Sequence, residues 1–218
     1  MVGFYLIFMS EAERNTRLTN IADYLIVNAS FLNDIGLYHG KMGISLFFAY
    51  CASYFQNDIY NDFAKVLLME VSDEISEDMN MSFENGISGI AWGILCLWEK
   101  GLISGNLNDL LKDIDCRMME IDLLRLSNYS LQKVGKGISC YIKYRLRLVG
   151  DDIEKTSFDK LYISEWIEMR KKLTELDDMS LASIVSMNQF KYDLLTSRVW
   201  KLGLQDGCAG YGLNLIML

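Results

Sequence analysis

Residues 36–44 read GLYHGKMGI, with Gly40 and Gly43 three positions apart directly before an apolar run. The same arrangement returns in residues 84–90 (ENGISGI), 132–138 (QKVGKGI) and 205–211 (QDGCAGY). In the third copy Val134 takes the place of the first glycine. One Gly-x-x-Gly pair carries little information, but four copies in register indicate a repeat architecture.

Each glycine pair begins a strongly apolar segment. These segments are residues 44–55, 90–98 and 138–148, with a fourth after Gly210. The first two are apolar nearly all round, which is typical of a buried helix. The segments between them carry one apolar stripe at helical spacing and predict outer helices. The predicted outer helices are residues 10–29, where Ser10 and Glu13 form a capping box, and residues 61–75, 106–124, 156–176 and 180–200.

The repeat predicts an all-α protein in which inner and outer helices alternate within a single domain, residues 1–218. The chain has 218 residues, 51% hydrophobic, with no proline, so an ordered core is expected and global disorder is excluded. The formal net charge of −8 argues against nucleic acid as a partner.

Compartment and membrane attachment are also predicted from composition. Five cysteines without a Cys-x-x-Cys pair indicate reduced thiols, so a cytoplasmic protein is expected. Val2–Met9 is an apolar run without a basic start, which favours a short strand or packing arm over a signal peptide. No segment reaches the roughly 18 apolar residues of a membrane span, so no membrane partner is expected.

Polar side chains flank the glycine turns and are the candidates for a peptide-binding surface, because all four turns precede inner helices and are expected to gather at one end. These residues are Tyr38, His39, Glu84, Asn85, Gln132, Lys133, Gln205 and Asp206. The alternative is that they cap the helices and shape the turns. Glu84 and Asp206 also allow an acid/base pair of the glycosidase type, although no acidic motif accompanies them.

Three of these segments resemble the glycine-rich repeats of the lanthionine synthetase cyclase (LanC-like) family. They are residues 36–44, residues 85–93 (NGISGIAWG) and residues 206–213 (DGCAGYGL). The resemblance implies an α/α toroid. It also implies a zinc ion that activates cysteine thiols of a precursor peptide for addition to dehydrated Ser or Thr residues. Four inner helices in place of the family's seven predict a partial or reduced toroid.

The family's zinc ligands, two cysteines and a histidine, are incomplete in this sequence. His39 occupies the histidine position before Gly40, so it is the candidate catalytic residue and metal ligand, with Cys208 as a candidate second ligand. No cysteine stands two positions before any first glycine of the repeats. A catalytic zinc site usually has three protein ligands, and the first and fourth turns are expected at opposite ends of the array unless the ring closes. No tightly bound cofactor is therefore expected, and zinc only if the protein is catalytic.

The resemblance implies a protein of peptide modification, reduced or zinc-less, that binds or acts on a peptide. If it is an enzyme, it is a zinc-dependent, thioether-forming peptide cyclase. The alternative is a non-catalytic helical-repeat module that binds peptides or serves as a scaffold. An array with open ends exposes apolar faces, so a homodimer or a complex with other modification proteins is expected.

Overall fold

The structure, a computed structural model, describes residues 9–173, 180–186, 188–192 and 199–217. These residues form helices joined by turns, and no strand occurs among them, which confirms the all-α class. The chain divides into two compact units, unit 1 (residues 1–74 and 180–218) and unit 2 (residues 75–179). The arm predicted over Val2–Met9 lies outside the described residues, apart from Met9.

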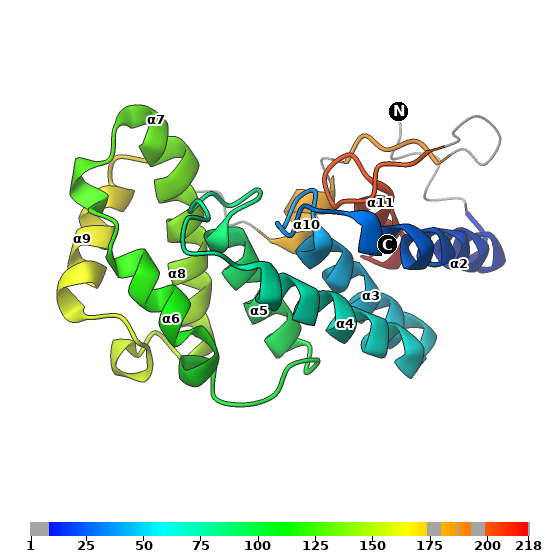
Figure 1. Ribbon diagram of the computed structural model, residues 1–218, viewed down its shortest axis with the longest axis horizontal. Coiled ribbons are helices and arrows are strands. Elements are labelled where there is room, and N and C mark those ends of the chain that lie inside the picture. Colours follow the sequence, from blue (N-terminus) through cyan, green and yellow to red (C-terminus); the bar gives the residue numbers. More distant parts are fainter. Residues whose placement is uncertain (1–8, 174–179, 187, 193–198, 218) are drawn as a thin grey trace. The chain divides into compact units, whose positions relative to one another are not determined.

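Unit 1 joins the two ends of the chain around one core. Its helices are α2 (Glu11–Asn28), the short η1 (Ala29–Phe31), α3 (Lys41–Phe55), α4 (Asp58–Glu74), α10 (Leu181–Ser186) and α11 (Cys208–Met217). Helix α3 packs against α4 on one side and α11 on another, and α11 also contacts α2 and α10 (Figure 1). Most of α3 and α11 is buried, as expected for inner helices.

Polar and charged side chains stabilise the starts of helices α2 and α3 in unit 1. The Ser10 hydroxyl accepts a hydrogen bond from the Glu13 amide, 3.2 Å, so the predicted N-cap is present. The Glu13 carboxylate pairs with Arg17 at 2.6 Å. Lys41 lies in the first turn of α3, where the helix dipole disfavours a cation. Its buried ammonium is compensated by Glu70 and Glu74 of α4, at 2.9 and 2.8 Å.

Unit 2 is a second helical core, built around α5 and α8, which pack together (Figure 1). Its helices are α5 (Ile87–Glu99), α6 (Leu107–Met119), η2 (Leu123–Arg125), α7 (Asn128–Ser130), the π-helical η3 (Leu131–Gly135), α8 (Lys136–Leu148), η4 (Ile153–Lys155) and α9 (Lys160–Arg170). Helix α5 is buried nearly all round, whereas α8 exposes Lys143 and Arg147. Each segment after a glycine pair is therefore helical, as predicted.

Three predicted outer helices are shorter than the sequence indicates. The helix expected over residues 106–124 is α6, Leu107–Met119. The helix expected over residues 156–176 is α9, Lys160–Arg170. The helix expected over residues 180–200 is wrong beyond α10, because residues 188–192 and 199–200 form no helix. Asn188 ends the helix: its side-chain oxygen accepts from the Phe190 amide at 2.7 Å, an Asx turn that competes with helical bonding.

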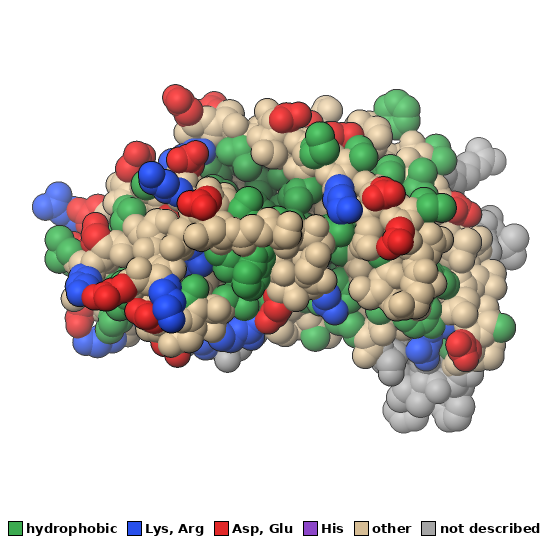
Figure 2. All heavy atoms as spheres, turned by 90° about the horizontal axis from the view of Figure 1, so that it is seen from below, with side chains coloured by type: hydrophobic (Ala, Val, Ile, Leu, Met, Phe, Trp, Pro, Cys, Tyr) green, Lys and Arg blue, Asp and Glu red, His purple; other side chains and the backbone are tan. Residues whose placement is uncertain are grey.

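Among the described residues, no helix combines the length and apolar character needed to cross a membrane. Acidic and basic side chains alternate over the face drawn in Figure 2, with apolar side chains between them. Mixed charges of this kind suit a solvated helix surface.

Candidate functional site

The first glycine turn folds back on the start of α3. The amides of Lys41 and Met42 donate to the carbonyl oxygens of Asp34 and Ile35, at 2.9 and 3.3 Å. A Cβ atom on Gly40 would lie 2.5 Å from the Asp34 carbonyl oxygen and against the Gly36 amide nitrogen. Glycine stands at position 40 because two backbone segments meet there, and not because of an unusual φ, which is −106°.

The second and fourth turns repeat this construction with the same register. The amides of Ile87 and Cys208 donate to carbonyl oxygens seven residues earlier, Asn80 at 2.9 Å and Lys201 at 2.8 Å. These bonds satisfy the first amides of the inner helices. The first amide of each of α3, α5 and α11 is therefore already paired within its own turn.

The third segment contains no turn, so the sequence prediction is wrong there. Residues 128–148 run continuously from α7 through η3 into α8, and Gln132 and Lys133 are exposed on the π-helical stretch. Val134 in place of the first glycine explains the difference, because the folded-back loop leaves no room for a Cβ at that position. Without the glycine the chain continues as a helix.

The first and fourth turns lie directly against each other. The Gln205 amide donates to the Tyr38 carbonyl oxygen at 3.0 Å. The two turns therefore do not stand at opposite ends of the array, which was the arrangement expected unless the ring closes. This contact brings four of the predicted surface residues together: Tyr38, His39, Gln205 and Asp206. We call this pair of turns, residues 34–40 and 201–207, the paired turns.

The side chains of the paired turns differ in exposure. His39 is exposed, Tyr38 is buried, and Gln205 and Asp206 are half-buried. Asp206 has a left-handed φ of 53° and accepts from the Gln189 amide at 3.1 Å. An Asp carboxylate held in this way shapes the turn, so nothing at Asp206 favours the acid/base pair with Glu84.

Asn188 lies outside the paired turns but contacts them, and the sequence prediction missed it. Its side-chain nitrogen donates to the carbonyl oxygens of Leu204 and Gly207, at 2.7 and 3.0 Å. It therefore fastens the stretch after α10 to the fourth turn. A lone asparagine inside a predicted helix gave no signal, because its partners lie 16 and 19 residues further along the chain.

The second turn, in unit 2, presents Glu84 and Asn85 to solvent. The Ser82 hydroxyl donates to the Asn85 side-chain oxygen at 2.7 Å, so Asn85 also stabilises its own turn. Gly137 at the start of α8 faces this turn, since a Cβ there would lie 2.6 Å from the Ser88 hydroxyl oxygen. Within unit 2 the second turn therefore lies against the start of α8, in the third repeat. Gln132 and Lys133 lie on the π-helical stretch that precedes α8.

The three buried cysteines, Cys51, Cys96 and Cys208, are poor metal ligands in this fold. Cys208 is fully buried, its sulfur lies 3.8 Å from the Leu202 carbonyl oxygen, and burial raises the pKa of its thiol to about 12. Burial likewise raises the pKa of Cys96 to about 12 and that of Cys51 still higher. Zinc binds the thiolate. No cluster of three or more His, Cys, Asp or Glu side chains suited to a metal occurs among the described residues.

Thiol reactivity checks this description of the cysteines. At pH 8 in native buffer, Cys116, which is exposed on α6, is expected to react rapidly with Ellman's reagent. Cys51, Cys96 and Cys208 are expected to react only after denaturation, because their thiols are buried and protonated. The Cys116→Ser variant should lack the fast phase. A fast phase assigned to Cys208 by peptide mapping would contradict the buried thiol.

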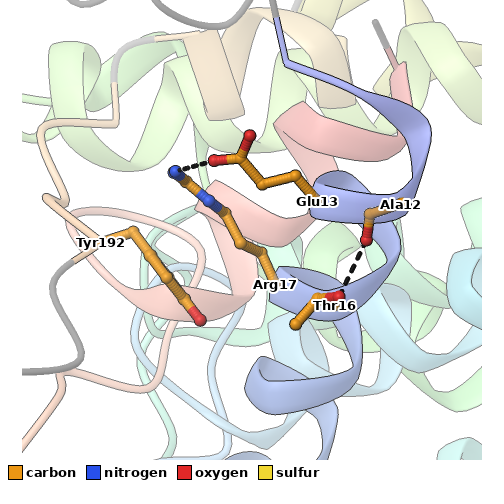
Figure 3. A pocket seen from close by; sticks show the side chains of 5 residues that line it. All are labelled: Ala12, Glu13, Thr16, Arg17 and Tyr192. Atoms are coloured by element: carbon orange, nitrogen blue, oxygen red, sulfur yellow. Dashed lines mark hydrogen bonds and ion pairs between the residues drawn. The ribbon is translucent and has the colours of Figure 1, made fainter.

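A pocket of about 390 Å³ opens beside α2 and is lined by Ala12, Glu13, Thr16, Arg17 and Tyr192 (Figure 3). Arg17 is already engaged by protein groups in this pocket. Its guanidinium pairs with Glu13, donates to the Tyr211 hydroxyl at 2.8 Å and lies 4.9 Å over the Tyr192 ring. Its charge is therefore compensated from the protein itself. The Thr16 hydroxyl is also engaged within the protein, since it donates to the Ala12 carbonyl oxygen at 2.8 Å.

Comparison with known sequences supplies one match. A sequence model of the family described as "Lanthionine synthetase C-like protein" matches residues 32–216, which covers all four repeats and reaches into both units. No curated protein and no solved structure matches the chain.

Proposed function

The chain belongs to the lanthionine synthetase C-like family, and from this we propose that it binds a peptide in peptide modification, at the paired turns of unit 1 and without zinc chemistry. The prediction of family membership from the glycine repeats is confirmed. The peptide, its binding site and the absence of zinc are what we propose beyond family membership.

One observation carries the proposal: the hydrogen bond between Gln205 and Tyr38 joins two turns that lie far apart in the sequence. It brings the backbone of Gln205, whose side chain is half-buried, against that of Tyr38, the residue before the exposed His39. Imidazole and carboxamide groups both donate and accept hydrogen bonds, which are the contacts that a peptide backbone offers. A rigid pair of turns presents them with little loss of conformational entropy on binding.

The side chains available as zinc ligands favour peptide binding without a zinc-dependent reaction. His39 is exposed and could supply one nitrogen, but the neighbouring Cys208 is buried as a protonated thiol. Ionising a buried thiol is costly, and one imidazole with water ligands retains zinc weakly. The residues present do not fit the metal site that the family implies, so no step of the proposed function passes through zinc.

Peptide binding is tested with a fluorescein-labelled synthetic peptide that contains several Ser, Thr and Cys residues, since the family's cyclases add Cys thiols to dehydrated Ser or Thr. Fluorescence anisotropy should show saturable binding to the full chain. His39→Ala is expected to weaken it roughly tenfold or more, because truncation of a central contact commonly costs over 1 kcal/mol. Lys133→Ala, on the exposed π-helical stretch of unit 2, is the matched control and should leave affinity unchanged.

Two results would overturn the proposed site. One is equal loss of binding in His39→Ala and Lys133→Ala, and the other is saturable binding that His39→Ala does not weaken. Absence of binding by a panel of such peptides would overturn the proposed function itself.

Metal content is predicted separately. Protein purified without chelator is expected to contain far less than one zinc per chain by elemental analysis, because three ligands are not assembled. His39→Ala should leave the small residual content unchanged. A stoichiometric zinc content that disappears in His39→Ala would contradict the zinc-free proposal and favour a thioether-forming cyclase.

A further inference from the structure

Gly203 lies four residues before Gly207 and outside the repeated glycine pair, yet it stands where the paired turns meet. A Cβ on Gly203 would lie 2.6 Å from the Cα of His39 and against the Tyr38 carbonyl oxygen. A Cβ on Gly207 would lie 2.6 Å from the Gly203 amide nitrogen. The backbones of Gly207, Gly203 and Tyr38–His39 are therefore packed in succession without side chains between them.

The turn by itself does not require glycine at this position. Ser82 is the corresponding residue of the second turn, which has the same backbone register, and its side chain is accommodated there. Gly203 also has no left-handed φ, since the positive-φ glycines of the described chain are Gly101, Gly105 and Gly150. The requirement at position 203 arises from the contact with the first turn.

We infer that Gly203 is a positioning residue for the peptide site, an inference that rests on the proposed function: its missing side chain seats the fourth turn on Tyr38–His39 and so fixes where the His39 imidazole is presented. The Gln205–Tyr38 hydrogen bond at 3.0 Å holds the same contact from the next residues along the turn. A methyl group at position 203 separates the two turns and displaces His39 relative to Gln205.

The molecule provides its own probe, because His39 is the only histidine in the chain. In the wild-type protein, NMR should show a nuclear Overhauser effect between the Cα protons of Gly203 and His39. The imidazole carbon-bound protons of His39 should give one pair of signals, and these signals should move in Gly203→Ala. The same variant should bind the labelled peptide roughly tenfold more weakly than wild type.

Gly212→Ala is the matched control. Gly212 lies on α11 in the same unit, and a Cβ there would meet the Phe47 ring, with Cδ2 at 3.1 Å, and not the paired turns. This variant is expected to lose stability but to keep the His39 signals and the peptide affinity of wild type. Urea unfolding of both variants gives the stability against which the two other readouts are compared.

The outcomes separate the positioning role from a structural one. Equal changes in the His39 signals and affinity for Gly203→Ala and Gly212→Ala would overturn the inference, as would a missing Gly203–His39 Overhauser effect in wild type. If Gly203→Ala does not fold, the inference is tested by the Gly203–His39 Overhauser effect in the wild-type protein. If wild type binds no probe peptide, the proposed function fails, while the His39 signals still report whether Gly203 positions the imidazole.

Discussion

Replacing Arg145 by methionine is expected to lower the free energy of unfolding of unit 2 by about 3–5 kcal/mol, since removing one partner of a buried ion pair leaves the other uncompensated. Arg145 and Asp115 are both fully buried, and the Arg145 Nε lies 3.9 Å from the Asp115 Oδ2. Asp115 accepts a hydrogen bond from Tyr141 at 2.5 Å, and Arg145 donates to the Asn108 side chain.

The same pair predicts a pH dependence with a definite sign. Burial raises the pKa of Asp115, and Tyr141 and Arg145 oppose that shift. Without Arg145 the folded-state pKa rises further, and a raised folded-state pKa stabilises the folded state below the unfolded value of about 4. That stabilisation is lost as pH rises through the folded-state pKa. The deficit of Arg145→Met is therefore expected to be smaller near pH 4 than at pH 7.

Urea unfolding in a Trp200→Phe background measures this, because the three remaining tryptophans, Trp92, Trp98 and Trp166, belong to unit 2. The double variant Asp115→Leu with Arg145→Met is the control. It should recover most of the loss, since apolar replacement of both partners is often neutral. A single-variant loss below about 1 kcal/mol, or a double variant no better than the single one, would show that the buried pair does not carry this stability.

Gly40→Ala is expected to destabilise unit 1 by about 3 kcal/mol, the upper range for overpacking. The new Cβ would lie 2.5 Å from the Asp34 carbonyl oxygen, and backbone atoms cannot move aside as the end of a flexible side chain can. Gly135→Ala is the matched control: its Cβ would meet the Met169 sulfur at 2.9 Å, and alanine improves helix propensity by about 1 kcal/mol.

Thermal or urea unfolding of the two variants checks this prediction. Gly135→Ala should remain within about 1 kcal/mol of wild type, because Met169 can change rotamer. Equal losses in the two variants would contradict the assignment of Gly40 to a backbone contact. A Gly40→Ala protein that fails to fold while Gly135→Ala folds would agree with it.

The sequence predicted the inner helices well, because their determinants are local. The three repeats that keep both glycines each mark a turn, and the apolar segments after all four repeats are helical. The Ser10 cap is also present where expected. The paired turns, by contrast, could not be predicted, since the Gln205–Tyr38 hydrogen bond joins residues separated by most of the chain.

The buried pair Asp115 and Arg145 had a sequence signal that was not used. Arg145 continues the apolar stripe of Ile138, Tyr141 and Ile142, and Asp115 lies beside the buried Ile114. A charge within a buried stripe indicates a partner across the core. The stripe alone could not identify that partner, because it lies on a different helix, α6.

What the sequence determined by itself is therefore the helical repeat: where the inner helices begin, which faces are apolar, and which family the chain resembles. These follow from glycine spacing and hydrophobic periodicity, which act over a few residues. Three features instead depend on the tertiary structure: the fourth turn packs on the first, Cys208 is a buried thiol, and Gly203 lies against the backbone of Tyr38 and His39. Each depends on segments brought together by burial of the core, and such contacts between distant segments leave no local pattern in the sequence.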